Sequence, residues 1–319
     1  RVALSILDLK KGDEIITQSF TFVATVESII ESRAIPICIE IDKSLNMCPA
    51  ALERSINKKT KAVILVHMLG APTDVYKISK ICKKYNIPLI EDTAWGCGGK
   101  FQNKYLGTFG RMGAFSFDFA KLITTGEGGM ILFNSKKDYL KAAAWHDHGH
   151  ENNPKLPRWE DSRSSSGFNY RMTELQGAVG LAQLRKLDKI INMQRKNYKL
   201  ILSEIKKLKG IELRNIPLNS YYTADALIFF VKNNKVALRC RQELLKLDIS
   251  TKILPEAISW HFSKKWDHIK ELNNMNNKLI NLNSSEIILS RSVSLPIFYF
   301  MKNNFAKKVY KALKIALDE

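Results

Sequence analysis

Cysteines are few in this chain and follow no pattern. Five occur among 319 residues, an odd number with no C-x-x-C pair: Cys38, Cys48, Cys82, Cys97 and Cys240. This spacing argues against a disulfide framework and against a zinc site, and it favours reduced thiols in the cytoplasm. Long apolar runs are also missing, since none approaches the roughly 18 residues of a membrane span. We expect no signal peptide, because the chain opens on an arginine in an amphipathic pattern.

Acidic residues are outnumbered by basic ones. The chain has 50 Lys and Arg against 31 Asp and Glu, a formal net charge of +19. The basic residues are spread through helices and loops and form no recognised nucleic-acid motif, so we expect a solvated, lysine-rich surface and no nucleic-acid partner. A positive field that attracts anionic substrates, such as nucleotide sugars or acidic sugars, is the alternative that stays open.

Strand and helix patterns alternate in the first part of the chain. Four apolar segments predict strands: 14–17, 35–41, 62–67 and 87–91. Helical patterns separate them: 22–32, 49–56 and 74–85. Alternating units of this kind predict an α/β fold with a mainly parallel sheet covered by helices. Ligands of such sheets collect at the carboxyl ends of the strands, where His67, Asp92 and Ser116 fall.

The second part of the chain has a different pattern. A helix at 136–146 and a polar loop at 147–169 precede a long helical stretch from 172 to about 209. Shorter strands, near Ile211 and at 224–231, then alternate with helices at 236–247 and 304–317. We therefore expect a large domain over residues 1–200 and a smaller α+β domain over residues 201–319.

Two residues carry the clearest chemistry. One predicted strand runs into Asp92, and an aromatic strand at 115–119 leads to Lys121, just before the turn TTGEGG. Pyridoxal phosphate needs this pair: a lysine forms the Schiff base with its aldehyde, and a carboxylate keeps the pyridine nitrogen protonated so that the ring accepts electrons. An ordinary α/β protein with a salt-bridged lysine is the alternative.

Further motifs surround these two residues along nearly the whole chain. They occupy 12–16, 19–25, 66–67, 91–92, 115–117, 126–129, 167–172, 174–176 and 295–296. In this order and spacing they resemble the sugar aminotransferases of the DegT/DnrJ/EryC1/StrS family, within fold-type I of the pyridoxal phosphate enzymes. The resemblance implies a homodimeric transaminase that transfers an amino group from glutamate to a keto or aldehydo sugar in surface-polysaccharide (lipopolysaccharide) biosynthesis.

The resemblance also implies roles for single residues. Lys121 is expected to transfer the proton that the substrate Cα releases during the reaction. A lysine at this position also distinguishes the chain from a dehydratase branch of the family, which has histidine there. Ser116 is expected at the cofactor phosphate, Phe22 over the cofactor ring, and Asn169 at the phosphate of the neighbouring subunit's cofactor. A capping serine, a core phenylalanine and a turn asparagine are the alternatives.

The chain departs from the family pattern in two places. Trp95 stands where the family usually has Gln or His, and it offers ring packing and one N–H donor but no acceptor. We still expect it at the cofactor. The Ser-Gly-Thr turn that normally binds the cofactor phosphate would lie before Arg1, so we expect an N-terminal segment to be missing. A truncated, non-catalytic homologue that binds or regulates is therefore the alternative function.

A histidine-rich segment, 146–154, follows the core motifs. Its spacing fits no standard zinc pattern, so we expect no metal and interpret it as a substrate-side loop. With the residues after it, it resembles the branch that aminates C8 of a 3-deoxyoctulosonate; a nucleotide-linked keto sugar is the broader alternative. Four residues are candidates for binding the sugar, the arginines through a carboxylate: His148, Arg158, Arg163 and Arg171. Solvent-exposed loop arginines are the alternative.

Overall fold

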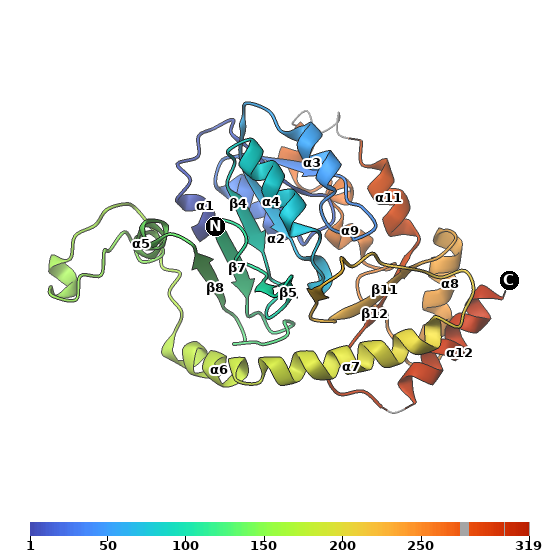
Figure 1. Cartoon of the computed structure of the whole chain (residues 1–319). Coiled ribbons are helices and arrows are strands. Elements are labelled where there is room, and N and C mark those ends of the chain that lie inside the picture. Colours follow the sequence, from blue (N-terminus) through green and yellow to red (C-terminus); the bar gives the residue numbers. More distant parts are fainter. Residues whose placement is uncertain (275–280, 303, 319) are drawn as a thin grey trace.

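A six-stranded sheet forms the centre of the first part of the chain (Figure 1). The computed structural model describes residues 1–274, 281–302 and 304–318. In spatial order the strands are β2 (Ile35–Ile39), β1 (Glu14–Gln18), β3 (Thr60–Val66), β4 (Leu89–Asp92), β7 (Met112–Ser116) and β8 (Gly129–Phe133). All neighbours are parallel except β7 and β8, which are antiparallel. The mainly parallel sheet is confirmed, whereas β8 was not expected from the sequence.

Helices cover both faces of this sheet. They are α1 (Val2–Ser5), α2 (Val23–Glu31), α3 (Pro49–Ser55), α4 (Val75–Lys84) and α5 (Lys136–Trp145). On one face, α3 and α4 pack against Val63 and Leu65 of β3. On the other face, α1, α2 and α5 pack against Ala62 and Ile64 of the same strand. Successive strand side chains point to opposite faces, which is why a strand buried on both sides is apolar throughout.

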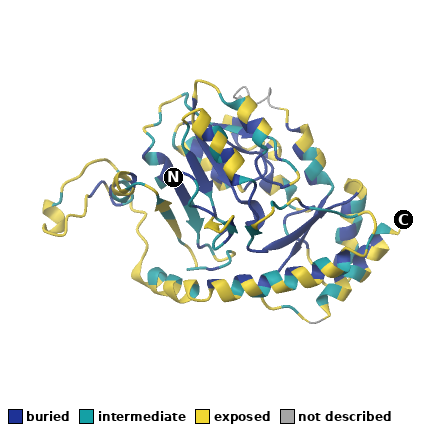
Figure 2. Ribbon diagram, viewed as in Figure 1, coloured by how far each residue is buried: buried dark blue, intermediate teal, exposed yellow. Residues whose placement is uncertain are grey.

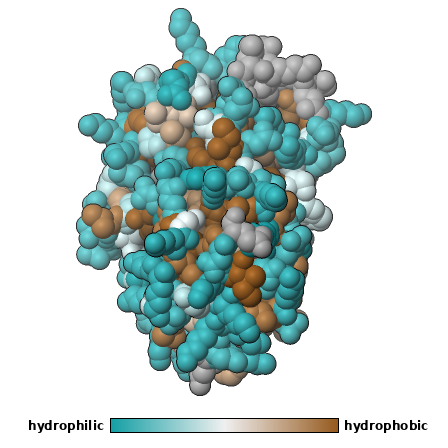
Figure 3. All heavy atoms as spheres, turned by 90° about the vertical axis from the view of Figure 1, so that its right-hand side faces the viewer, coloured by the Kyte–Doolittle hydropathy of each residue, from teal (hydrophilic) through white to brown (hydrophobic). Residues whose placement is uncertain are grey.

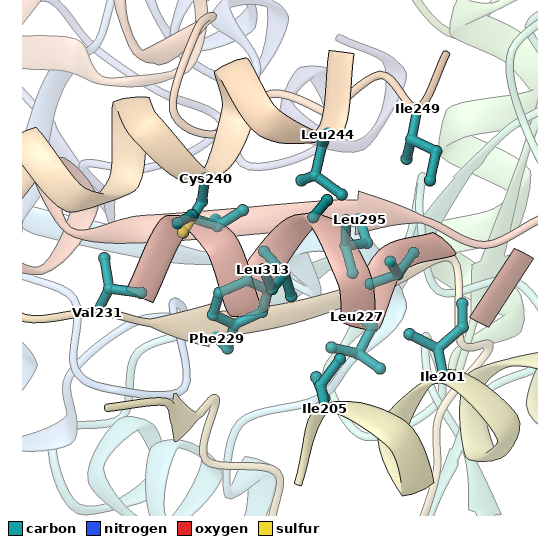
Figure 4. Packing of buried hydrophobic residues seen from close by; sticks show 14 of the residues in the cluster. Ile201, Ile205, Leu227, Phe229, Val231, Cys240, Leu244, Ile249, Leu295 and Leu313 are labelled. Carbon is teal, nitrogen blue, oxygen red and sulfur yellow. The ribbon is translucent and has the colours of Figure 1, made fainter. Parts of the chain in front are cut away.

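A second, antiparallel sheet follows in the second part of the chain. It contains β12 (Ser292–Pro296), β11 (Ala226–Phe230) and β9 (Glu212–Leu213), in that order. Three helices pack on it: α7 (Leu187–Ile205), α8 (Asn234–Leu245) and α12 (Phe305–Leu317). Figure 4 shows Leu244 of α8 and Leu313 of α12 in the same buried cluster as Phe229 of β11. The opposite face of β11 packs on the first part of the chain, through Ile228 and Phe230. The boundary expected at residue 200 falls inside α7 and stays a prediction.

The helical stretch expected from 172 to about 209 is not one helix. It consists of two helices, α6 (Glu174–Leu184) and α7, which are separated by Arg185 and Lys186. Together the two helices run along one side of the molecule (Figure 1). The aromatic strand expected at 115–119 lies earlier in the chain, since β7 spans Met112–Ser116 and the chain turns after it.

Between α5 and α6 the chain forms an extended arm, residues 147–172, which projects from the body of the molecule (Figure 1). It contains one short 3₁₀ helix, η2 (Arg158–Glu160), and is mostly exposed (Figure 2). The remaining elements are short: η1 (Met68–Gly70), β5 (Lys100–Phe101), β6 (Lys104–Tyr105), β10 (Ser220–Tyr221), α9 (Ile258–His261), η3 (Ser263–Lys265), α10 (Lys270–Asn274) and α11 (Asn283–Ser290).

The surface on the side of α8 and α12 is mostly hydrophilic, with small hydrophobic patches between polar side chains (Figure 3). Of the helices in the described residues, none combines the length and the hydropathy needed to cross a membrane. The amphipathic helices of this side bury one face in the core and expose basic residues on the other, as α12 does.

Candidate active site

A cavity of about 780 Å³ lies at the carboxyl ends of β3, β4 and β7. These strands contribute Val66, Asp92 and Ser116 to its lining. Parallel strands end at one edge of a sheet, so the site has the position that the sequence predicted. Of the three residues expected at these strand ends, His67 is absent from the lining: it is fully buried, and its Nε2 lies 3.0 Å from Glu91 Oε2.

Asp92 is the last residue of β4, and its carboxylate is fixed by two donors. The hydroxyl of Thr25, in the first turns of α2, donates to Oδ2 at 2.8 Å. The backbone N–H of Ala94 donates to Oδ1 at 3.1 Å. Both bonds orient the carboxylate at the cavity, where it can pair with a protonated ring nitrogen. Thr25 lies in the motif at 19–25, but no role was expected for its side chain from the sequence.

Lys121 follows β7 in a turn closed by a hydrogen bond from its backbone N–H to the carbonyl of Asp118, at 3.0 Å. Its side chain lines the cavity, and its Nζ lies 4.0 Å from the centre of the Trp95 ring. Burial lowers the pKa of the Lys121 amine, against the opposing effect of nearby carboxylates. Lys121 forms no ion pair with any described residue, which argues against a salt-bridged structural lysine.

Aromatic residues form another part of the cavity wall. Phe22 precedes α2 and is 42% exposed, and its ring centre lies 5.7 Å from that of His261 at the end of α9. Burial lowers the pKa of His261, which favours its neutral form. No sequence signal pointed to His261, because it belongs to a four-residue helix far from the other site residues. Ser116 also lines the cavity, and its hydroxyl accepts the N–H of Asp118 at 3.4 Å.

These residues fit pyridoxal phosphate. The amine of Lys121 is partly desolvated and free to react with an aldehyde, and Asp92 opens to the same cavity. When bound, the cofactor supplies an aldehyde and a ring that accepts electrons from the substrate. Asp92 would hold the ring nitrogen, Lys121 the aldehyde and Ser116 the phosphate, with Phe22 and Trp95 packing at the ring.

Asn169 and all four candidate sugar-binding residues lie in the arm and do not line this cavity. Arg158 donates to both carboxylate oxygens of Asp147, at 3.0 and 2.6 Å, and Arg171 pairs with the same carboxylate. The hydrogen bond from Arg158, with a smaller contribution from Arg171, holds the pKa of Asp147 well below its usual range despite burial. Asn169 is exposed and forms a β-bridge with Asp147. The two arginines therefore have a structural partner within the arm.

The other two candidates from the arm, His148 and Arg163, are exposed. Arg163 forms a β-bridge with His150, whose Nδ1 lies 3.2 Å from Asp161 Oδ2. No group of three or more His, Cys, Asp or Glu side chains suited to a metal ion occurs among the described residues. Contact of the candidate residues with a sugar stays a prediction.

Known proteins resemble most of this chain in sequence. Residues 1–314 match the model of the DegT/DnrJ/EryC1/StrS aminotransferase family. The GDP-perosamine synthase of Vibrio cholerae is 35% identical over 256 residues, 75% of this chain and 68% of the relative. That of Escherichia coli O157:H7 is 38% identical over 195 residues, 61% of this chain, and the match spans about half, 52%, of the relative's length.

The fold agrees with these matches. The crystal structure of an aminotransferase from Psychrobacter cryohalolentis superimposes with a TM-score of 0.88 at 25% identity, covering 100% of this chain and 85% of that one. The fold-type I architecture expected from the sequence is thereby confirmed. The chain belongs to the DegT/DnrJ/EryC1/StrS aminotransferase family, a family of pyridoxal-phosphate-dependent sugar aminotransferases.

Proposed function

We propose that this chain transfers an amino group from glutamate to a nucleotide-linked keto sugar, in nucleotide-sugar or surface-polysaccharide biosynthesis. One observation carries the proposal: Lys121 and Asp92 open into one cavity at the carboxyl edge of the sheet. A truncated, non-catalytic homologue would not need both groups in this arrangement. The cysteines among the described residues are free thiols, which fits the cytoplasmic location that we propose.

The chain's own residues can move the proton that transamination requires. A desolvated Lys121 is neutral more readily than an exposed lysine, so Nζ would accept the proton from the substrate Cα and deliver it to the cofactor carbon that carried the aldehyde. Asp92 stays oriented by Thr25 and Ala94 throughout. Phe22 and His261 line the same cavity, with their ring centres 5.7 Å apart.

The two candidate acceptor sugars differ in where they carry their negative charge. An 8-oxo-3-deoxyoctulosonate carries a carboxylate on the sugar, whereas a nucleotide-linked keto sugar carries its charge on a diphosphate far from the reacting carbon. Two of the three arginines expected at a sugar carboxylate, Arg158 and Arg171, both pair with Asp147. Relatives named GDP-perosamine synthases also support the nucleotide-linked acceptor.

The test uses the visible absorption of the bound cofactor. The purified protein should bind pyridoxal phosphate with an absorption band at about 410–430 nm, and Lys121→Ala should lose this band. Lys136→Ala, a change of an exposed lysine on α5, should keep the band and serves as the matched control. A band that persists in Lys121→Ala would contradict the assignment.

The acceptor is tested on protein that glutamate has first converted to its amino form. A nucleotide-linked 3- or 4-keto sugar should restore the visible band. Recovery with the octulosonate alone would select the narrower alternative. No recovery with any carbonyl sugar would reject the aminotransferase function for this chain.

We propose that the active protein is a homodimer in which both subunits contribute residues to each active site. No residue of α6, all of them described, is buried, and Leu175 and Leu181 are 81% and 61% exposed (Figure 2). Such an apolar helix next to the exposed arm is typical of an interface. Asn169 would then reach the cofactor phosphate of the second subunit. Mixtures of Lys121→Ala and Asn169→Ala proteins should regain activity through hybrid dimers, and an active monomer would contradict this.

A further inference from the structure

Trp95 contacts two lysines from distant parts of the chain. Nζ of Lys121 lies 4.0 Å from the centre of the indole, and Nζ of Lys252 lies 4.8 Å from it. The two ammonium groups are therefore within about 9 Å of each other, and both are in cation–π contact with one ring. Lys252 is fixed to the second sheet, because its backbone N–H donates to the carbonyl of Ser294 in β12 at 2.8 Å.

The second sheet also holds Lys252 and Trp95 through side chains. Nζ of Lys252 donates to Asp225 Oδ1 at 2.7 Å, and Asp225 lies directly before β11 with only 8% of its surface exposed. The hydroxyl of Thr223, two residues earlier, donates to the backbone carbonyl of Trp95 at 3.3 Å. The segment 223–225 thus contacts Trp95 in two ways: Thr223 binds its backbone directly, and Asp225 binds Lys252, which contacts its ring.

A tryptophan at position 95 is where the sequence departs from the pattern it otherwise resembles. Its indole offers no hydrogen-bond acceptor, but its face attracts cations more strongly than other aromatic rings do. We propose that Lys252, held by Asp225, is a positioning residue for the reaction: it fixes Trp95 against Lys121 and couples the second sheet to the reacting amine. This inference rests on the proposed function of Lys121.

The charges around Lys121 set the expected consequence. Five groups face its amine: Asp92, Asp118, Asp225, Lys252 and His261. The three carboxylates favour the ammonium form and Lys252 disfavours it. Loss of the Lys252 charge also leaves one carboxylate unpaired, so both effects raise the pKa of Lys121. For a charge within about 9 Å the expected rise is about 0.3 to 1 pH unit.

The experiment measures the pKa of the Lys121 amine in cofactor-free protein. Competitive labelling with acetic anhydride across pH, quantified for the Lys121 peptide by mass spectrometry, gives its titration midpoint without any catalysis. Lys252→Met should raise the titration midpoint by about 0.3 to 1 pH unit. Lys252→Arg keeps a cation at this position and should have the wild-type midpoint. Asp225→Asn, which keeps the cation and removes a carboxylate, should lower it. Lys246→Met, at a surface lysine paired with Glu243 at 2.6 Å, is the matched control and should not shift the midpoint.

Coupling through the indole is tested by a double-mutant cycle on kcat. In a Trp95→Leu background, Lys252→Met should cost less activity than in the wild-type protein, with little change in the KM for glutamate. An unchanged midpoint in both Lys252→Met and Asp225→Asn, or strictly additive losses in the cycle, would overturn the inference. Absence of a cofactor band in the wild-type protein would instead reject the proposed function, while the labelling measurement would still report on Lys252.

Discussion

Replacement of Glu91 by glutamine is expected to destabilise the protein markedly. The carboxylate is fully buried and accepts the backbone N–H groups of Gly107, Phe109 and Gly110, at 2.8, 2.6 and 2.8 Å. Its fourth contact is His67 Nε2, at 3.0 Å. Burial disfavours the ionised form, but the bond to His67 and the backbone donors outweigh burial and hold the pKa of Glu91 below its ordinary value.

The magnitude follows from the geometry of these contacts. Oε1 faces the N–H groups of Phe109 and Gly110, while Oε2 faces Gly107 and His67. In either orientation, the NH₂ of a glutamine would face at least one backbone N–H, and two donors cannot pair. An unpaired buried N–H costs about 1–3 kcal/mol, and the loss of charge-assisted bonds adds about 1 kcal/mol. We expect the free energy of unfolding to fall by about 2–4 kcal/mol.

Urea unfolding followed by circular dichroism measures this loss. The midpoint of Glu91→Gln should fall by about 0.5–1 M. Glu53→Gln is the control, because Glu53 is an exposed partner of Lys84 on the surface, and its midpoint should stay unchanged. Equal midpoints for Glu91→Gln and wild type would refute the reasoning.

The same variant has a pH signature. Because the pKa of Glu91 is lower in the folded than in the unfolded protein, the unfolded state binds more protons in acid. The stabilisation is present above the unfolded pKa and is lost as the pH falls through the folded pKa. The difference in stability between wild type and Glu91→Gln should therefore shrink below about pH 4. A difference that stays constant from neutral pH into this acid range would contradict the linkage.

Other substitutions test the rest of the structure. Thr25→Val removes the hydroxyl that orients Asp92, so the affinity for pyridoxal phosphate should fall about tenfold in an absorbance titration; unchanged affinity would show that the bond is dispensable. Leu313→Ala opens the fully buried cluster of the second sheet and should cost about 2–5 kcal/mol in urea unfolding, whereas a loss below this range would mean that the core collapses around the gap. Asp147→Asn removes the carboxylate that holds two arginines, so amide hydrogen exchange should accelerate in residues 148–171 alone; uniform exchange would refute this.

The sequence alone determined the local structure and the chemistry of the site. Short continuous apolar runs and helical repeats identified the parallel strands and most helices, because both patterns depend on neighbours a few residues apart. Asp92 and Lys121 were recognisable because each lies at or just after a strand end, within motifs of fixed spacing. Where local patterns were continuous, as at 115–119 and 172–209, no local signal indicated that the strand would end at Ser116 or that the helix would divide.

Only the tertiary structure decided which distant residues meet. Lys252 reaches Trp95 across more than a hundred residues of chain, and Thr25 reaches Asp92 from another strand–helix unit. Arg158 and Arg171, both expected at a substrate carboxylate, pair with Asp147 within the arm, and their contact with a substrate stays a prediction. Contacts of this kind depend on how strands order themselves in the sheet and how the two sheets pack. The hydrophobic pattern fixes which face of each element is buried, but it leaves the partner across the interface undetermined.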